Sequence, residues 1–175
     1  MKTGGWLLCF LALTLALAMP LLAKDRLGVY QGWAAFRDPA TPRCYAISAP
    51  DETLRTPKRP AFMAIGFWPK RGITHQIYVR LSRDRAVNSG VTLSAGGRRF
   101  RLKAAGETIW ATDRRMDMAI VAAMRSSTSL SIEAIGDDGR SIVDAYSLRG
   151  APSAIDAAAL GCAGINKDVR RIDSP

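Results

Sequence analysis

Two cysteines, Cys44 and Cys162, have 117 residues between them and follow an apolar N-terminal segment that has the features of an export signal. Cysteines of exported proteins usually pair, because the compartments outside the cytoplasm are oxidising. We therefore predict one disulfide that joins the beginning of the domain to its end. Two buried free thiols are the alternative. A disulfide over this distance requires a single domain in which the last element packs against the first strands.

The export signal is predicted at residues 1–23. An uncharged stretch over 7–19 is followed by a proline, a small residue at position 23 and a charged run that begins at Lys24. This order is typical of a cleaved signal peptide, and it predicts a periplasmic protein whose mature chain has no transmembrane helix. A retained inner-membrane anchor is the alternative, because the apolar segment approaches the length of a membrane-spanning helix.

Most of the remaining chain has the alternating pattern of β-strands. Turn sequences at 69–72, 96–97 and 137–139 predict antiparallel hairpins. Residues 49–60 contain three prolines and five charged residues, which indicates a loop. The predicted strands are 29–36, 44–47, 62–68, 73–81, 91–95, 98–103, 107–111, 130–135 and 141–148.

Two segments have a helical pattern instead. Apolar residues recur at helical spacing over 113–125, and an alanine-rich segment over 152–160 begins at Pro152 and is followed by Gly161. The predicted fold class is mainly β: a single antiparallel β-sandwich-like domain with one inserted helix and a short C-terminal helix. The domain is expected at 24–162, and the polar residues 163–175 are expected to form a flexible tail.

Positive charge is concentrated in one part of this basic chain, whose formal net charge is +10. Residues 55–103 contain one acid, Asp84, and twelve basic residues. The basic residues are Arg55, Lys58, Arg59, Lys70, Arg71, Arg80, Arg83, Arg85, Arg98, Arg99, Arg101 and Lys103. A basic stripe of this kind attracts polyanions, although a merely solubilising surface is the alternative.

An exported protein is expected to meet lipopolysaccharide, anionic lipid headgroups or acidic glycans as polyanions, rather than nucleic acid. We therefore predict an anionic envelope component, or a periplasmic protein, as the partner and expect no nucleic-acid partner. The candidate anion-binding residues are Arg80, Arg83, Arg98, Arg99, Arg101 and Lys103.

Catalytic chemistry has little support in the sequence. His75 is the only histidine, so any Ser-His-Asp mechanism requires it, and strict alternation places it on the same face as Ile73, Ile77 and Val79. That is the expected core face, and no nucleophile elbow is present. We predict no catalytic, cofactor-binding or metal-binding residues. A small envelope hydrolase or isomerase that uses His75 stays open as the alternative.

Aromatic residues are numerous in and around the basic stripe. Their strand-like spacing predicts that they fill the core rather than bind a ligand. This prediction covers Trp33, Phe62, Phe67, Trp68, Tyr78, Phe100 and Trp110.

Residues 119–160 include the Ser-Leu-Arg-Gly segment 147–150 and the Ala-Ile-Asp-Ala segment 154–157. Over these residues the chain resembles the invasion-associated locus B family of exported alphaproteobacterial proteins. Gly32-Trp33 and the region of Cys44 resemble the opening strand and first cysteine region of that family. The resemblance is that of a divergent member of the family. It implies an envelope-associated β-sandwich-like domain without known catalytic residues. The family is linked by its name to host-cell invasion.

Overall fold

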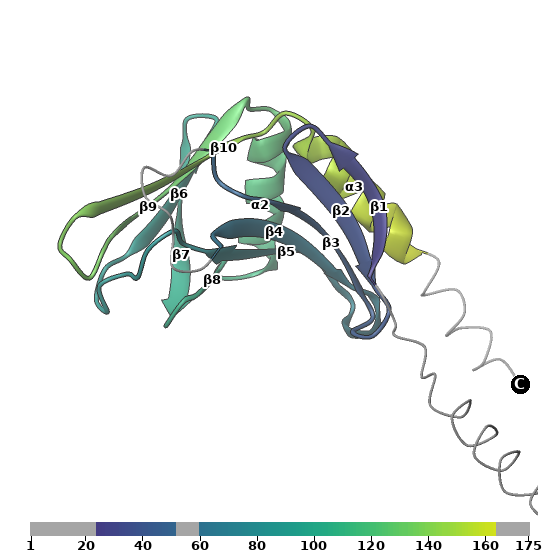
Figure 1. Cartoon of the computed structure of the whole chain (residues 1–175), viewed down its shortest axis with the longest axis horizontal. Coiled ribbons are helices and arrows are strands. Elements are labelled where there is room, and N and C mark those ends of the chain that lie inside the picture. The colour runs from purple at the N-terminus through teal and green to yellow at the C-terminus, as the bar shows by residue number, and fades with distance from the viewer. Residues whose placement is uncertain (1–23, 52–59, 164–175) are drawn as a thin grey trace, which may run out of the picture.

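The computed structural model describes residues 24–51 and 60–163 (Figure 1). This part is mainly β, with ten antiparallel strands, one helix inserted between strands and one at the C-terminal end, which confirms the predicted fold class. The strands are β1 (Asp25–Tyr30), β2 (Trp33–Asp38), β3 (Arg43–Ser48), β4 (Phe62–Trp68), β5 (Ile73–Arg80), β6 (Val91–Ala95), β7 (Arg98–Ala105), β8 (Thr108–Trp110), β9 (Ser129–Ile135) and β10 (Ser141–Ser147). The helices are α2 (Arg114–Arg125) and α3 (Ala151–Ala163), and a short 3-10 helix, η2 (Pro69–Arg71), joins β4 to β5.

The strands form one sheet in the order β1-β2-β3-β4-β5-β8-β7-β6-β9-β10. β7 joins its two halves, because residues 98–102 pair with β6 whereas residues 103–105 pair with β8. Figure 1 shows that the sheet bends there, so that β6, β9 and β10 turn away from the direction of β3, β4 and β5. Buried residues of both halves belong to a single core, which gives the sandwich-like arrangement.

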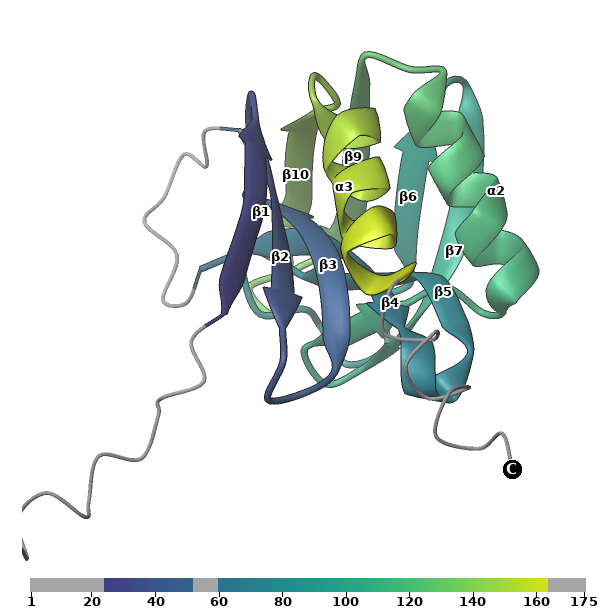
Figure 2. The same ribbon diagram turned by 90° about the vertical axis from the view of Figure 1, so that its right-hand side faces the viewer.

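Both helices cover the same face of the sheet (Figure 2). α3 packs on β1, β2, β3 and β4, and α2 packs mainly on β5 with contacts to β6 and β7. Trp33, Ile120, Tyr146 and Ile155 are fully buried between these layers. We call the opposite face of the sheet the outer face. Within the described residues, no helix packs on it.

The first predicted strand, 29–36, is wrong as a single element. The chain turns at Gln31 and Gly32, so that β1 and β2 form a hairpin in which Tyr30 pairs with Trp33. Gln31 has a φ of 55°, a left-handed conformation that non-glycine residues adopt uncommonly. The alternation of VYQGWAAF continues across this turn, which is why the sequence pattern does not show it.

The inserted helix agrees with its prediction. Asp113 is the N-cap of α2, and its side chain accepts a hydrogen bond of 2.9 Å from the amide of Met116. The C-terminal helix is longer than predicted, because α3 continues through Gly161 to Ala163. Gly161 lies against the side chain of Leu27 on β1, where a Cβ would come within 2.4 Å of Leu27 Cδ1. Glycine therefore permits close packing of the helix on the sheet here, rather than ending the helix.

The structure pairs Cys44 with Cys162. Cys44 lies on the helix-covered face of β3 and Cys162 in the last turn of α3, with sulfurs 2.08 Å apart and Cα atoms 5.7 Å apart. Both residues are buried. The predicted disulfide therefore fastens the end of the domain to its third strand.

Three parts of the sequence-based predictions lie outside the described residues. They are the signal peptide at 1–23, most of the predicted loop at 49–60, and the tail beyond residue 163. Arg55, Lys58 and Arg59 of the basic stripe fall in the second of these. Among the residues that the structure describes, no helix has the length and apolar character needed to span a membrane.

Candidate anion-binding face

Three of the candidate basic residues form a row on β7. Arg99, Arg101 and Lys103 are exposed, whereas Phe100 and Leu102 between them are buried. Because successive side chains of a strand point to opposite faces, the three cations share the outer face. The sequence therefore places three positive charges on one strand without an intervening acid.

The ion pairs of this row are weak or lacking within the described residues. Arg99 lies 3.8 Å from Glu133 on β9, and both side chains are largely exposed. An exposed pair of this kind contributes about 0–1 kcal/mol, so the guanidinium stays available to a stronger anion. Arg101 and Lys103 form no ion pair within 4.0 Å with any residue that the structure describes.

Arg80 lies on the same outer face, on β5. Its guanidinium is placed 4.7 Å from the ring centre of Phe62, the residue opposite it on β4, and its Nε donates a hydrogen bond of 2.7 Å to the carbonyl of Pro60. These two contacts hold the side chain in one orientation. The structure thus brings Arg80 to the same face as the β7 row, on the far side of the short strand β8.

The two remaining candidates are separated from this face. Arg83 donates hydrogen bonds of 2.9 and 3.2 Å to the carboxylate of Asp138, in the turn between β9 and β10. Arg98 begins β7 and lies over the ring of Phe100, 4.9 Å from its centre, on the side of the sheet opposite Arg99. Neither residue belongs to the row, and sequence proximity alone had grouped them with it.

Arg85 of the basic stripe has a structural role instead. Its Nη1 donates to the carbonyls of Ala86, Val87 and Ser89 at 2.6–2.8 Å, which fixes the loop between β5 and β6. A guanidinium that satisfies several main-chain carbonyls is not free for a ligand. Within the stripe, Arg83 and Arg85 thus have structural contacts, whereas Arg99, Arg101 and Lys103 are exposed cations of the outer face.

The aromatic prediction is right for some residues and wrong for others. Trp33, Phe67 and Phe100 are buried, as predicted. Four others are on the outer face with intermediate or greater exposure, because the strand positions that alternate with theirs point to the core. They are Phe62, Trp68, Tyr78 and Trp110. Tyr78 alternates with Ile77 and Val79, and Trp110 follows the buried Ile109, so the local alternation already favoured the outer face for these two rings.

His75 lies at a bulge in β5. Gln76 pairs with Gly66 and Ile73 with Trp68, so two residues of β5 oppose one of β4, and His75 has a φ of 59°. The bulge breaks the strict alternation that had grouped Ile73 with His75. His75 keeps to the helix-covered side, with its ring edge-on to Phe67 at 4.8 Å between ring centres.

The surroundings of His75 do not assemble a catalytic dyad. Its Nδ1 is buried and has no hydrogen-bond partner, and no hydrogen bond joins the ring to a hydroxyl or carboxylate in the described part of the chain. Burial lowers the pKa of the imidazole, and the positive charges of Arg125 and Arg114 lower it further, while Asp156 opposes them. The ring is consequently a neutral, half-buried packing residue near neutral pH.

Two buried carboxylates also have structural contacts. Asp117 of α2 accepts a hydrogen bond of 2.8 Å from the amide of Ile77, and Asp144 of β10 accepts hydrogen bonds from the amide and hydroxyl of Ser82. Burial raises the pKa of both carboxyl groups. Burial also raises the pKa of the nearby Tyr146 hydroxyl, which has no hydrogen-bond partner among the described residues. Asp117, Asp144 and Tyr146 are all buried in the described structure.

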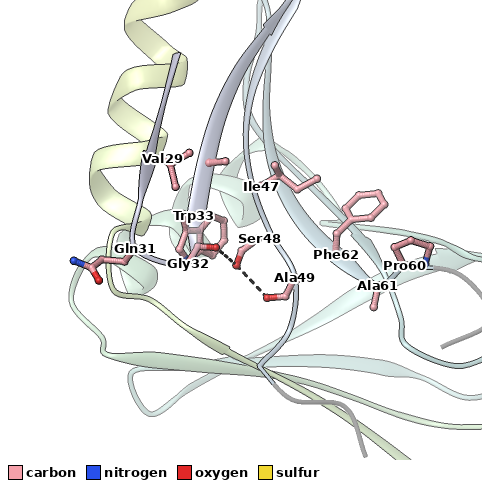
Figure 3. A pocket seen from close by; sticks show the side chains of 11 residues that line it. Val29, Gln31, Gly32, Trp33, Ile47, Ser48, Ala49, Pro60, Ala61 and Phe62 are labelled. Carbon is pink, nitrogen blue, oxygen red and sulfur yellow. Dashed lines mark hydrogen bonds between the residues drawn. The ribbon is translucent and has the colours of Figure 1, made fainter. Parts of the chain in front are cut away.

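One surface pocket of about 330 Å³ lies at the turn between β1 and β2 and the adjoining ends of β3 and β4 (Figure 3). Its lining contains no ionisable side chain. The hydroxyl of Ser48 lies 2.7 Å from the carbonyl of Gly32 and 3.0 Å from that of Ala49, so it is engaged within the protein. The lining residues are Val29, Gln31, Gly32, Trp33, Ala34, Ile47, Ser48, Ala49, Pro60, Ala61 and Phe62. The pocket can accept an apolar group, but it offers no acid–base chemistry.

Comparison with known proteins gives no match: no family model, no curated protein and no solved structure is similar to this chain. The resemblance to the invasion-associated locus B family therefore stays a prediction from the sequence. Within residues 24–51 and 60–163, no group of three or more His, Cys, Asp or Glu side chains is placed to hold a metal ion. Among the features of the described structure, the exposed cations of the outer face give the most support to a function, namely the binding of an anion.

Proposed function

We propose that this protein is an exported, non-catalytic module that binds an anionic component of the cell envelope through the outer face of its sheet. The observation that carries the proposal is the row of Arg99, Arg101 and Lys103 on β7. Three exposed cations at alternate positions of one strand present their charge in a line, with Arg80 on the same face. The predicted signal peptide and the periplasmic location are part of this proposal.

The row is suited to a polyanion because nearby acids neutralise little of its charge. The residues opposite Arg101 and Arg99 on β6 are Thr92 and Ser94, which are uncharged, and Glu133, opposite Thr92 on β9, forms only the exposed 3.8 Å ion pair with Arg99. Neighbouring positive side chains that a β-sheet holds in place create a local positive potential, which attracts phosphate and carboxylate groups. Arginine adds specificity, since its planar guanidinium can hold such a group through two parallel hydrogen bonds.

Binding to lipopolysaccharide and to vesicles containing an anionic phospholipid tests this function. The variant carries Arg99→Glu, Arg101→Glu and Lys103→Glu. We expect binding by the unchanged protein to weaken as salt rises, because exposed charges are screened, and we expect the triple variant to lose at least about tenfold in affinity.

A matched variant with the same change in net charge controls for overall electrostatics. Arg114→Glu, Arg115→Glu and Arg149→Glu alter three exposed cations away from β7. Equal losses in both triple variants would reduce the effect to net charge and overturn a specific role for the row. Unchanged binding in the β7 variant, or no binding of any anionic probe by the unchanged protein, would overturn the proposal and leave a protein partner as the function to pursue.

A further inference from the structure

Two aromatic residues lie side by side at the centre of the outer face. Tyr78 on β5 is directly opposite Trp110 on β8, and both are on the face away from the helices. Opposite residues of an antiparallel pair have Cβ atoms about 4.5–5.5 Å apart, so the two side chains are neighbours. Tyr78 also stacks on Phe62 of β4, with ring centres 5.5 Å apart and an angle of 27° between the ring planes. The side chains therefore form an aromatic platform, defined here as Phe62, Tyr78 and Trp110.

The platform continues directly into the basic row. Trp110 is opposite Lys103 of β7, and Phe62 is opposite Arg80 of β5. Lys103 thus borders the platform on the β7 side, and Arg80 borders it along β5, two residues after Tyr78. Arg80 is held over Phe62, and 38% of Tyr78 is exposed although its ring is large and apolar. Aromatic surface and positive charge are consequently offered to the same ligand.

This combination matches the chemistry of an acidic sugar better than that of a lipid bilayer. A pyranose ring presents an apolar C–H face, which packs on an aromatic ring, and carries its carboxylate or phosphate at the ring edge. One such unit can contact Tyr78 or Trp110 and reach Lys103 or Arg80 together. Insertion into a bilayer instead requires apolar side chains that project from a tip or an amphipathic helix, whereas these rings lie across the middle of a sheet.

An acidic polypeptide matches the face less well for a related reason. Its carboxylates could pair with the cations of β7, but an acidic segment has few apolar groups with which to cover the rings. The geometry points to an acidic glycan as the ligand of the outer face, with Tyr78 and Trp110 as the stacking residues and Lys103 and Arg80 as the anion contacts. This inference rests on the proposed function, because it names the class of envelope component bound.

The test uses oligogalacturonate as the acidic sugar and its methyl-esterified form as the neutral one. Calorimetric titration of the full mature chain is expected to show binding to the acidic oligomer and at least about tenfold weaker binding to the ester. Tyr78→Ser and Trp110→Ala are each expected to weaken binding of the acidic oligomer by about fivefold or more, which is the lower end of the loss seen when an aromatic ring that stacks on a nucleic-acid base is removed.

Two control variants make the test specific: one keeps the ring at position 78, and the other removes an aromatic ring outside the platform. Tyr78→Phe retains the platform and should bind within about twofold of the unchanged protein, since only the hydroxyl is lost. Phe36→Ala removes a half-buried aromatic ring on β2, several strands away, and should not alter binding. If Trp110→Ala strongly lowers the thermal midpoint of unfolding, its binding result is not used. The contribution of the rings to glycan binding is then decided by Tyr78→Ser, because Tyr78 is exposed.

The possible results separate this inference from the proposed function. Loss of glycan binding in the ring variants, with vesicle binding unchanged in them, supports the glycan. If the ring variants bind oligogalacturonate normally while the β7 charge variant does not, the outer face is a general anion site. That result would overturn the aromatic platform as a glycan site. Binding to anionic vesicles or to polyglutamate but not to oligogalacturonate would also overturn it, in favour of lipid or acidic protein. Loss in the ring variants alone, with the charge variant unaffected, would keep the platform and overturn the β7 row.

Discussion

The indole nitrogen of Trp33 donates a hydrogen bond of 2.8 Å to the main-chain carbonyl of Ser147, 114 residues later in the chain. This contact joins the start of β2 to the end of β10, so it bridges the two halves of the sheet. Close by, Gly150 lies against the main chain of Tyr30. The Gly32-Trp33 and 147–150 segments, which carry much of the family resemblance, therefore meet in space. Their shared role in the described structure is to close the domain.

Trp33→Phe tests the first of these contacts. The variant keeps an aromatic ring but leaves the carbonyl of Ser147 without its donor, so we expect the free energy of unfolding to fall by about 1–3 kcal/mol. Urea denaturation measures the change. Trp68→Phe on the half-exposed outer face is the control and should cost less than about 1 kcal/mol. Equal effects of the two substitutions would contradict a special role for the Trp33 hydrogen bond.

Gly150→Ala tests the second contact. Gly150 has a φ of 84°, and a Cβ there would lie 2.0 Å from the carbonyl oxygen of Tyr30. Gly139 has a similar φ of 75°, but a Cβ at that position would meet no other atom within 4 Å. Gly139→Ala should therefore cost only the conformational term of about 1–2 kcal/mol, and Gly150→Ala clearly more, because main chain must also move. Comparable midpoints of chemical denaturation for the two variants would show that the packing at Gly150 adapts.

Removal of the disulfide tests the clamp on α3. In the chain-entropy description, a crosslink between residues separated by 118 positions stabilises the fold by about 4–5 kcal/mol, and replacement of Cys44 and Cys162 by alanine should lose about this amount. Denaturation without reductant measures the difference. Because Cys162 lies in the last turn of α3, hydrogen exchange should increase most in that helix. Uniform loss of protection across the sheet would contradict the local clamp.

Asp117 tests how α2 is anchored on the sheet. Asp117→Ala leaves the amide of Ile77 without an acceptor and should reduce the free energy of unfolding by about 1–3 kcal/mol. Asp117→Asn keeps an oxygen acceptor and removes the charge that burial disfavours, so it should have a much smaller effect. Thermal and urea denaturation of both variants give the comparison. If the two variants lose equal stability, the carboxylate acts by its charge and not as an acceptor for Ile77.

His75 predicts a pH dependence of stability. Its pKa is lower in the folded protein than in the unfolded chain, so below about pH 6.5 the unfolded chain takes up a proton more readily than the folded one. The contribution of His75 to the free energy of unfolding is therefore fully present above the pKa that the residue has in the unfolded chain. It falls as the pH decreases, by at most about 1.4 kcal/mol per pH unit. Asparagine tolerates the left-handed backbone at this position, so His75→Asn should remove this component while other titrations cancel in the difference.

The difference in unfolding free energy between the unchanged protein and His75→Asn should accordingly be constant above about pH 7 and decrease towards pH 5. Urea denaturation over this range measures it. A difference that does not vary with pH would mean that the imidazole titrates alike in both states. A difference that grows as pH falls would mean that the folded protein stabilises the charged ring.

The prediction of elements succeeded where a local pattern has one meaning. Gly96-Gly97 and the Asp-Asp-Gly turn at 137–139 connect hairpins as predicted, and Asp113 caps α2. The turn at Gln31-Gly32 was missed, because the flanking residues Tyr30 and Trp33 both favour β-strands and the segment was read as one strand. Gly161 was misread as the end of a helix, because the side chain of Leu27 that packs against it lies 134 residues earlier.

The candidate site was only partly visible in the sequence. The alternation of Arg99, Arg101 and Lys103 with Phe100 and Leu102 is local, so their common face could be read directly. The grouping of Arg83 and Arg98 with them was not justified by the fold, since Arg83 pairs with Asp138 in a distant turn. Tyr78 was assigned to the core although its alternation with Ile77 and Val79 already pointed to the opposite face. That Tyr78 and Trp110 are neighbours there depends on the pairing of β5 with β8, which no local pattern shows.

By itself, the sequence determined the mainly β character, the hairpins and the inserted helix, and it favoured a disulfide between Cys44 and Cys162 over two free thiols. These depend on side-chain periodicity, turn chemistry and the presence of only two cysteines beyond the predicted signal peptide, which are properties of neighbouring residues or of simple counting. Only the tertiary structure decided which aromatic rings are buried, which arginines are engaged by carboxylates or carbonyls, and which cations share a face. Those outcomes depend on strand order and on contacts between residues far apart in the chain, and a local pattern contains neither.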